Sequence, residues 1–295
     1  MKDKIIFIIS MFIFGTIGIF RKFIPLDSAV ISFSRGVIGT LFLVLFLLIR
    51  KDEINLKELK KYSLLLIVSG CLIGINWLFL FESYKYTSVA TSTLCYYMAP
   101  IFVMFASPFV FKEKLNVVNI VCMMLAFIGM VFVSGVFETG LNDKNTIIGV
   151  LYGLAAAVFY AIVVIINKKI KVENAFYKTL IQLFFSAIIL IPYLIINRSF
   201  DGTELNFKVL ILILIVGIIH TGIAYVLYFG SMTKVKTQFI SLFSYVDPVV
   251  AIILSAIILK EQMTLLGIIG AVLILGASLF MEVYEVKQKV KSEWI

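Results

Sequence analysis

The feature that most constrains this chain is a succession of long apolar runs separated by short polar loops. A helix that crosses the hydrocarbon core of a bilayer needs about 20 mostly apolar residues. Ten runs of about this length lie near residues 4–21, 29–49, 63–84, 89–111, 117–135, 147–167, 175–196, 208–230, 237–259 and 264–283. Backbone groups in hydrocarbon must bond within the protein, and no strand alternation is present, so these runs predict transmembrane helices.

Composition supports lipid as the solvent for much of this surface. Hydrophobic residues make up 62% of the 295 residues and charged residues 15%, whereas a soluble domain is about 25% charged. The opening Met1–Lys4 and the apolar stretch 5–20 resemble a signal peptide, but no small-residue cleavage pattern follows. We therefore expect a first transmembrane helix, and an all-α polytopic membrane protein of ten helices.

The net charge of +9 predicts orientation and not nucleic-acid binding, because the basic residues sit in short loops between apolar runs. With the N-terminus inside, the inner segments carry 18 Lys and Arg residues and the outer loops seven, while Arg35 lies within a run. Positive loops stay in the cytoplasm. We expect both termini in the cytoplasm and the chain in the plasma (bacterial inner) membrane. The polar linker 50–61 is either a solvated loop or a helix on the surface of anionic lipid.

An internal repeat appears when the chain is shifted by 148 residues, without any gap between 74–132 and 222–280. The aligned residues include Gly74 and Gly222, Phe81 and Phe229, Ser83 and Ser231, Leu94 and Leu242, Tyr97 and Tyr245, Pro100 and Pro248, Ser107 and Ser255, and Lys112-Glu113 and Lys260-Glu261. Each half would hold five helices, and an odd number reverses the orientation of the second half. Inverted repeats are a recurrent transporter architecture with the solute site near the midplane.

These duplicated segments resemble the drug/metabolite transporter superfamily, in particular its EamA type. The segments that carry the resemblance are Tyr97-Met98-Ala99-Pro100 with Lys112-Glu113-Lys114, Tyr245-Val246-Asp247-Pro248 with Lys260-Glu261-Gln262, and 84–90, together with Arg35. The resemblance covers nearly the whole chain. It implies two five-helix repeats, at 1–136 and 147–284, a short cytoplasmic tail at 285–295, and transport of a small solute, often export. Glu82 departs from the family, which usually has an apolar or small residue there.

Ionisable residues within membrane spans are costly and usually face a cavity or a partner. Asp247 lies near the middle of its run beside Pro248, and it is either a proton, cation or solute site or a structural carboxylate. His220, the only histidine, is either a proton-exchange group or a neutral bridge between helices. Arg35 and Glu82 lie towards the outer ends of their runs. They could pair with each other at a gate or reach interfacial water.

Polar and aromatic side chains complete the candidate solute-binding set. Its members are Arg35, Asn76, Trp77, Glu82, Tyr97, Gln182, His220, Tyr225, Tyr245 and Asp247, with Pro100 and Pro248 as helix breaks for gating. Packing between helices is the alternative for each, although Tyr97 and Tyr245 gain weight from their duplication beside the prolines. Rings around a cavity could stack a planar solute or hold a cation.

The sequence lacks the motifs of metal sites, cofactor sites and common enzyme classes. The three cysteines lie far apart within apolar runs, and no P-loop, G-x-S-x-G or HExxH motif occurs, so we expect no metal, no cofactor and no enzyme. We predict a secondary carrier for an amino acid, an amine or a nucleobase-like metabolite, more often exported. Transport is either proton-coupled or facilitative, by a monomer or a homodimer. The alternatives are a receptor or structural membrane protein, and a membrane-embedded lipid enzyme.

Overall fold

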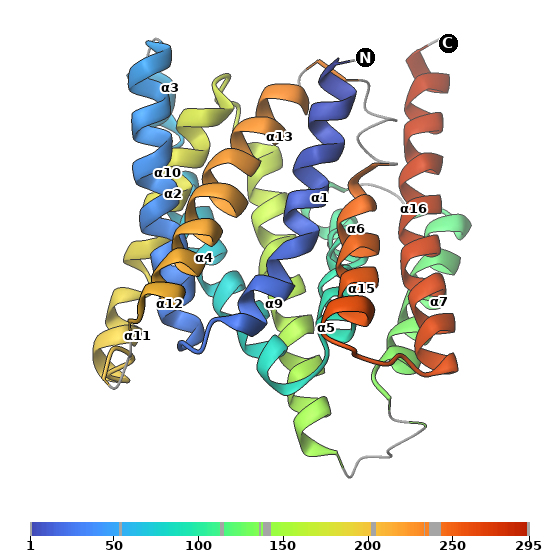
Figure 1. The fold of residues 1–295 in the computed structure, drawn as a ribbon. Coiled ribbons are helices and arrows are strands. Elements are labelled where there is room, and N and C mark those ends of the chain that lie inside the picture. The colour runs from blue at the N-terminus through green and yellow to red at the C-terminus, as the bar shows by residue number, and fades with distance from the viewer. Residues whose placement is uncertain are drawn as a thin grey trace.

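The computed structural model describes residues 2–52, 55–112, 115–135, 137, 143–201, 205–232, 234–235 and 243–293, and all regular structure in them is helical. The helices are α1 (Lys2–Phe23), α2 (Ser28–Arg50), α3 (Leu56–Lys61), α4 (Ser63–Tyr86), α5 (Val89–Tyr96), α6 (Ala99–Phe111), α7 (Val117–Val133), α9 (Lys144–Lys169), α10 (Ala175–Ile188), α11 (Ile191–Ile196), α12 (Phe207–Leu214), the π-helix η2 (Ile215–Ile223), α13 (Ala224–Met232), α15 (Val246–Ile258) and α16 (Leu265–Glu293). Both ends of the chain lie at the same end of the bundle (Figure 1).

Eight helical stretches within the described residues are long and apolar enough to cross a bilayer, and α7 and α15 are shorter apolar helices. The chain is therefore a multi-pass membrane protein. The start of the expected ninth helix, 237–242, lies outside the described residues, as do Glu113 and Lys114 of the duplicated motif. Helix α16 continues through most of the expected tail at 285–295, to Glu293. Linker 50–61 contains α3, which Asn55 caps through its side chain.

The stretch 89–111 is one span made of two helices. It breaks at Tyr97 and Met98, directly before Pro100, which has no N–H to continue the helical ladder. The chain repairs the break locally, because the Tyr97 N–H bonds to Thr93 O at 2.9 Å and the Met98 N–H to Cys95 O at 3.1 Å. The expected break beside Pro100 is therefore present. Around Pro248 a turn at Tyr245 precedes α15.

Helix packing relates the two halves of the sequence. The long helix α9 packs on α4, α5 and α6 in the centre of the bundle, and α1 packs correspondingly on α13 and α15 (Figure 1). In the same way α10 packs on α4 while α2 packs on η2, and α7 pairs with α16 at one edge. Exchanging helices with their counterparts 148 residues away relates the contacts of α9 with α4 and α6 to those of α1 with α13 and α15, whereas the counterpart of α5, 237–244, lies largely outside the described residues.

Small residues allow the closest helix approaches. A Cβ at Gly129 would meet the Gly270 carbonyl oxygen at 2.7 Å, and a Cβ at Gly270 would meet the Gly129 oxygen at 2.5 Å. Both approaches are too close for a methyl group, so the α7–α16 contact requires glycine on both sides. Gly276, on the same helix α16, has nothing within 4 Å of its Cβ position.

We predict that Gly270→Ala lowers the thermal unfolding midpoint in detergent, because overpacking costs about 1–3 kcal/mol. Gly276→Ala is the matched control, and it should leave the midpoint unchanged or raise it, since alanine favours a helix by up to about 1 kcal/mol over glycine. Fluorescence-detected size exclusion after heating measures both. Equal midpoints for the two variants would contradict the close α7–α16 contact.

Candidate functional site

The first cluster of predicted residues surrounds Asp247 at the start of α15. The Tyr97 hydroxyl donates a 2.8 Å hydrogen bond to Asp247 Oδ2, and the Tyr97 and Tyr245 rings lie 6.3 Å apart. Asp247 Oδ1 has no hydrogen-bond partner within the described part of the chain. The two duplicated tyrosines thus meet, and a carboxylate with one free oxygen lies beside the broken helix α5–α6.

The second cluster surrounds Arg35, whose side chain is buried to 5% exposure. Its Nε donates a 2.7 Å hydrogen bond to Thr221 Oγ1, and its guanidinium lies 4.0 Å from the centre of the Trp77 ring. An Arg35–Glu82 ion pair is not formed. Glu82 instead bonds Lys85 at 2.6 Å, one turn further along its own helix α4. Of the two alternatives for these residues, the ion pair is therefore not the one observed, because the shared depth of two side chains does not place them on facing sides of their helices.

The π-helix η2 shapes this second cluster. Thr221 Oγ1 donates to Val216 O at 3.1 Å and His220 Nδ1 lies 3.3 Å from Ile215 O, so both side chains reach carbonyls five residues back. His220 Nε2 also lies 2.8 Å from the Thr16 hydroxyl of α1. His220 is therefore held between α1 and η2, and Thr221 is turned towards Arg35. A π-helical turn is rare and often marks a functional site. The apolar sequence carries no signal for it.

Helix α1 connects the two clusters. A Cβ at Gly15 would meet the Asp247 carbonyl oxygen at 2.5 Å, and the next residue, Thr16, contacts His220. Phe14 packs its ring 5.5 Å from Tyr225. Arg35 and Asp247 attract each other electrostatically without forming an ion pair. The two charges thus face one aromatic interior from different helices.

Tyr160 of α9 shows that this interior is accessible. Its side chain is 40% exposed, although its ring lies 5.4 Å from that of Tyr96. The exposed lipid-facing stripe of α9 includes Leu151 and Ile162, and at 100° per residue Tyr160 points about 180° away from it. Its exposed surface therefore faces the inside of the bundle.

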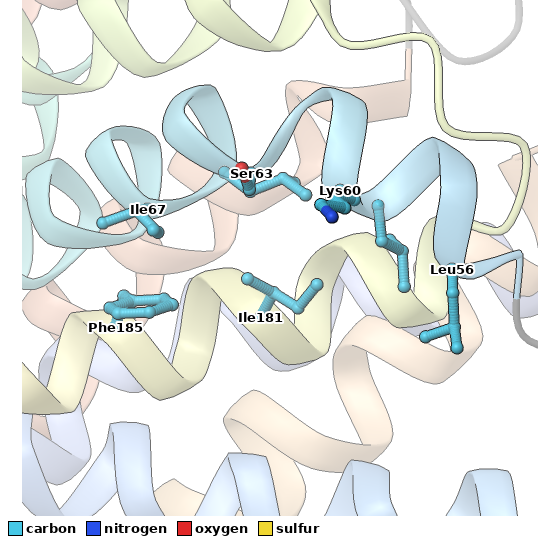
Figure 2. A pocket seen from close by; sticks show the side chains of 8 residues that line it. Leu56, Lys60, Ser63, Ile67, Ile181 and Phe185 are labelled. Carbon is cyan, nitrogen blue, oxygen red and sulfur yellow. The ribbon is translucent and has the colours of Figure 1, made fainter.

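Of two apolar surface grooves, one lies between α15 and α16 and includes Tyr245 of the first cluster, whereas the other lies away from both clusters. This second groove, of about 530 Å³, lies between α3, the start of α4 and α10, and its lining is apolar apart from Lys60 and Ser63 (Figure 2). It lies on the flank of the bundle and contains none of the predicted site residues. We assign it to the lipid-facing surface on the chemistry of its walls.

Asn76 and Gln182 bond other helices instead of facing the interior. The Asn76 amide donates to Ala156 O at 2.6 Å, which joins α4 to α9. The Gln182 amide donates to Ser69 Oγ at 2.7 Å and to Asn167 Oδ1 at 2.8 Å, which joins α10 to α4 and α9. Their contacts correspond to the helix-packing alternative.

A polar network lies at the end of the bundle opposite to the chain ends. Glu261, after α15, accepts the Val89 N–H at 2.8 Å and pairs with Lys22 of α1 at 3.4 Å, and it also bonds Ser255. Lys22 donates in addition to Thr87 O at 3.2 Å. The network ties α1, α5 and α15 together. The repeat marked Glu261, but sequence reasoning did not find its partner Lys22.

Among the described residues, no group of three or more His, Cys, Asp or Glu side chains could hold a metal ion. The three cysteines, Cys71, Cys95 and Cys122, are free thiols. The polar chemistry of this interior therefore consists of one acid, one guanidinium, one imidazole and several phenols.

Comparison with known proteins places this geometry in context. Residues 3–135 and 147–283 match the EamA-like transporter family. The chain is 33% identical over 267 residues to the uncharacterized transporter YxxF of Bacillus subtilis (strain 168), covering 90% of this chain and 85% of that protein. It is 26% identical over 193 residues to a "probable amino-acid metabolite efflux pump" of Salmonella typhimurium, covering 62% and 63%. A crystal structure with 16% identity covers 94% of this chain and 95% of its own at a TM-score of 0.61, which supports the fold alone.

We predict that Glu261→Gln loosens the closed end, because it removes an ion pair and a charged helix cap. A loss of about 1–2 kcal/mol shifts a two-state equilibrium about 5–30-fold. The reporter is Ala90→Cys, next to Val89 and buried, in a background with the three native cysteines changed to alanine. Its labelling rate with a membrane-impermeant maleimide should rise.

Lys144→Gln is the control for this experiment. It removes a charge from the start of α9 at the same end of the bundle, and Lys144 forms no ion pair within the described residues. Its labelling rate should equal that of the parent. If Glu261→Gln labels no faster than Lys144→Gln, the network does not hold this end closed.

Proposed function

Since this chain belongs to the EamA-like transporter family, we propose that it is a secondary exporter of small organic metabolites that works by alternating access. The resemblance inferred from the duplicated motifs is confirmed, and the protein is a membrane transporter and not an enzyme. The observation that carries the proposal beyond the family is the pair of opposite charges, Asp247 and Arg35, facing one accessible aromatic interior.

The proposed solutes are amino acids, amines or nucleobase-like metabolites. The rings of three tyrosines form a continuous series, in which the Tyr96 centroid lies 6.2 Å from that of Tyr97 and 5.4 Å from that of Tyr160. Aromatic walls accept planar or cationic groups. Export of an amino-acid-like solute agrees with the printed name of the Salmonella relative.

The proposed architecture is an inverted repeat of two five-helix halves, 1–136 and 147–284, in ten membrane crossings. The exchange-related helix packing supports it. So does the backbone at Lys112 and Lys260, which the 148-residue shift aligns and which have positive φ values of 57° and 56°. The bias of Lys and Arg towards alternate loops supports cytoplasmic termini in the plasma membrane.

In this orientation the Lys22–Glu261 network closes the outer side, and the arrangement described is closed to the outside. Alternating access then requires the network to separate when the opposite side closes. The broken helix α5–α6 and the start of α15 would rearrange at Pro100 and Pro248, because the missing proline N–H removes a hydrogen bond that resists bending.

Proton coupling through Asp247 is part of the proposal. Tyr97 stabilises the ionised carboxylate at Oδ2, while Oδ1 remains available for a proton or for a cationic group of the solute. Competition between the two for one carboxylate would couple proton entry to solute release. His220 and Glu82 are weaker candidates for proton exchange, because His220 already bonds the Thr16 hydroxyl and Glu82 already pairs with Lys85.

We predict that Asp247→Asn abolishes the response of transport to a pH gradient. The amide cannot exchange a proton in the physiological range, so gradient-driven accumulation should fall to the level without a gradient. Counterflow, which needs no gradient, should persist for neutral solutes. The measurement is uptake of labelled amino acids, amines and nucleobases into liposomes that contain the purified protein, with and without the gradient.

Asp201→Asn is the matched control, since Asp201 is exposed in the turn after α11. It should respond to the gradient as the parent does. Transport that depends on the gradient equally in parent and Asp247→Asn would refute coupling at Asp247 but keep the carrier. Absence of counterflow for every solute in the parent would count against the carrier itself.

A further inference from the structure

Arg35 is a buried cation without an acidic partner. Its side chain is 5% exposed, and within the described residues it donates one hydrogen bond, to Thr221, and forms no ion pair. Four of its five N–H groups belong to the terminal nitrogens, and neither nitrogen has a hydrogen-bond partner among those residues. The acid that attracts it, Asp247, is bonded to Tyr97 instead.

Such a residue is expensive to keep in a membrane protein. Arginine does not lose its proton in proteins, and removing an ion from water carries a large desolvation penalty. The stacking on Trp77 at 4.0 Å and the 5.9 Å approach to Phe81 return only part of that penalty. Packing alone therefore does not offset the charge, and an anionic partner is missing.

The missing partner has a defined chemistry. A guanidinium whose Nε is already bonded offers its terminal nitrogens to an acceptor, and carboxylates are the acceptors that match this geometry. We propose that Arg35, seated on Trp77, is the recognition site for the carboxylate of the transported solute. This inference rests on the proposed carrier function and narrows its solutes to those with a carboxylate.

Charge balance favours a carboxylate over a phosphate. A carboxylate carries one negative charge and neutralises Arg35, whereas a phosphate dianion would leave an excess negative charge near Asp247. If the solute also has an ammonium group, Asp247 Oδ1 can accept a hydrogen bond from it, and both charges of the interior are paired at once. A simple amine leaves Arg35 unpaired, as does a neutral nucleobase.

Thr221 is the positioning residue for this site. Its hydroxyl accepts from Arg35 Nε and donates to Val216 O, so its single proton is committed to the backbone of η2. The π-helix thereby fixes the guanidinium plane over Trp77. Thr221 touches no solute in this scheme, and its loss should misorient Arg35 while leaving the charge in place.

The experiment uses Trp77 as the reporter. The chain has two tryptophans, so Trp294→Phe leaves Trp77 as the only indole. The purified full-length protein is titrated with L-phenylalanine, 3-phenylpropionate and 2-phenylethylamine, and with the aliphatic set L-leucine, 4-methylpentanoate and 3-methylbutylamine. Both carboxylate-bearing members of at least one set should change the emission saturably, and the matched amine should not.

The variants separate recognition from folding. Arg35→Gln should weaken carboxylate binding at least about tenfold, the loss expected for a charged hydrogen bond. Its thermal midpoint without solute should equal or exceed that of the parent, because an unpaired buried charge is removed. A structural role would lower it. If Arg35→Gln does not fold, Thr221→Val should weaken carboxylate binding and Thr221→Ser should restore it.

The outcomes distinguish this inference from the carrier itself. A matched amine that binds as tightly as its carboxylate, no emission change with any carboxylate, or unchanged binding in Arg35→Gln (Thr221→Val where that variant does not fold) would each overturn the Arg35 site. Liposome flux that is indifferent to Arg35→Gln overturns the site and keeps the carrier. Carboxylate binding at Trp77 without counterflow keeps the site and overturns the carrier.

Discussion

The constraint on which this structure depends is that every backbone N–H and C=O in hydrocarbon needs a partner inside the protein. Regular helices meet it without help from neighbours. The chain departs from regular helix at Tyr97–Met98 and at η2, and in both places local bonds close the gap. These two irregular segments hold Asp247's partner Tyr97 and Arg35's partner Thr221. Both charged residues of the candidate site thus have a hydrogen-bond partner in a segment where the regular helical ladder is interrupted.

The two charges of the interior, buried Arg35 and partly buried Asp247, are kept apart by the same architecture. Asp247 is satisfied by a phenol and Arg35 by a hydroxyl and an indole face, and α1 runs between them with Gly15 against one cluster and Thr16 against the other. A direct ion pair would neutralise both charges and leave nothing for a solute to complete. Separation costs stability in the empty protein, and the cost is recovered only when a ligand bridges or pairs the charges.

Much of the fold could be predicted from the sequence, since run length and hydropathy alone require membrane helices. The break before Pro100 followed from proline chemistry. The duplication marked Tyr97 and Tyr245 as candidates, but it did not predict that their rings meet. The pairing of Arg35 could not be predicted. It depends on the π-helical turn that points Thr221 at α2, and the sequence of Ile215–Ile223, although it contains the chain's only histidine, does not predict a π-helix. Depth along a helix suggested Glu82, but rotation about the axis decides which side chains meet.

The charged residues at the closed end and at the interior site differ in their exposure to solvent. Lys22 and Glu261 are partly exposed, with side-chain exposures of 29% and 17%, so water and salt weaken their attraction and the pair can separate in a thermal fluctuation. Arg35 is buried, and breaking its contacts would expose a charge to hydrocarbon. A transporter needs this division. The group that closes the pathway must open at low cost, whereas the group that recognises solute must stay in place while the helices around it move. The exposures of the solvated pair and the desolvated cation agree with the proposed roles of closure and recognition.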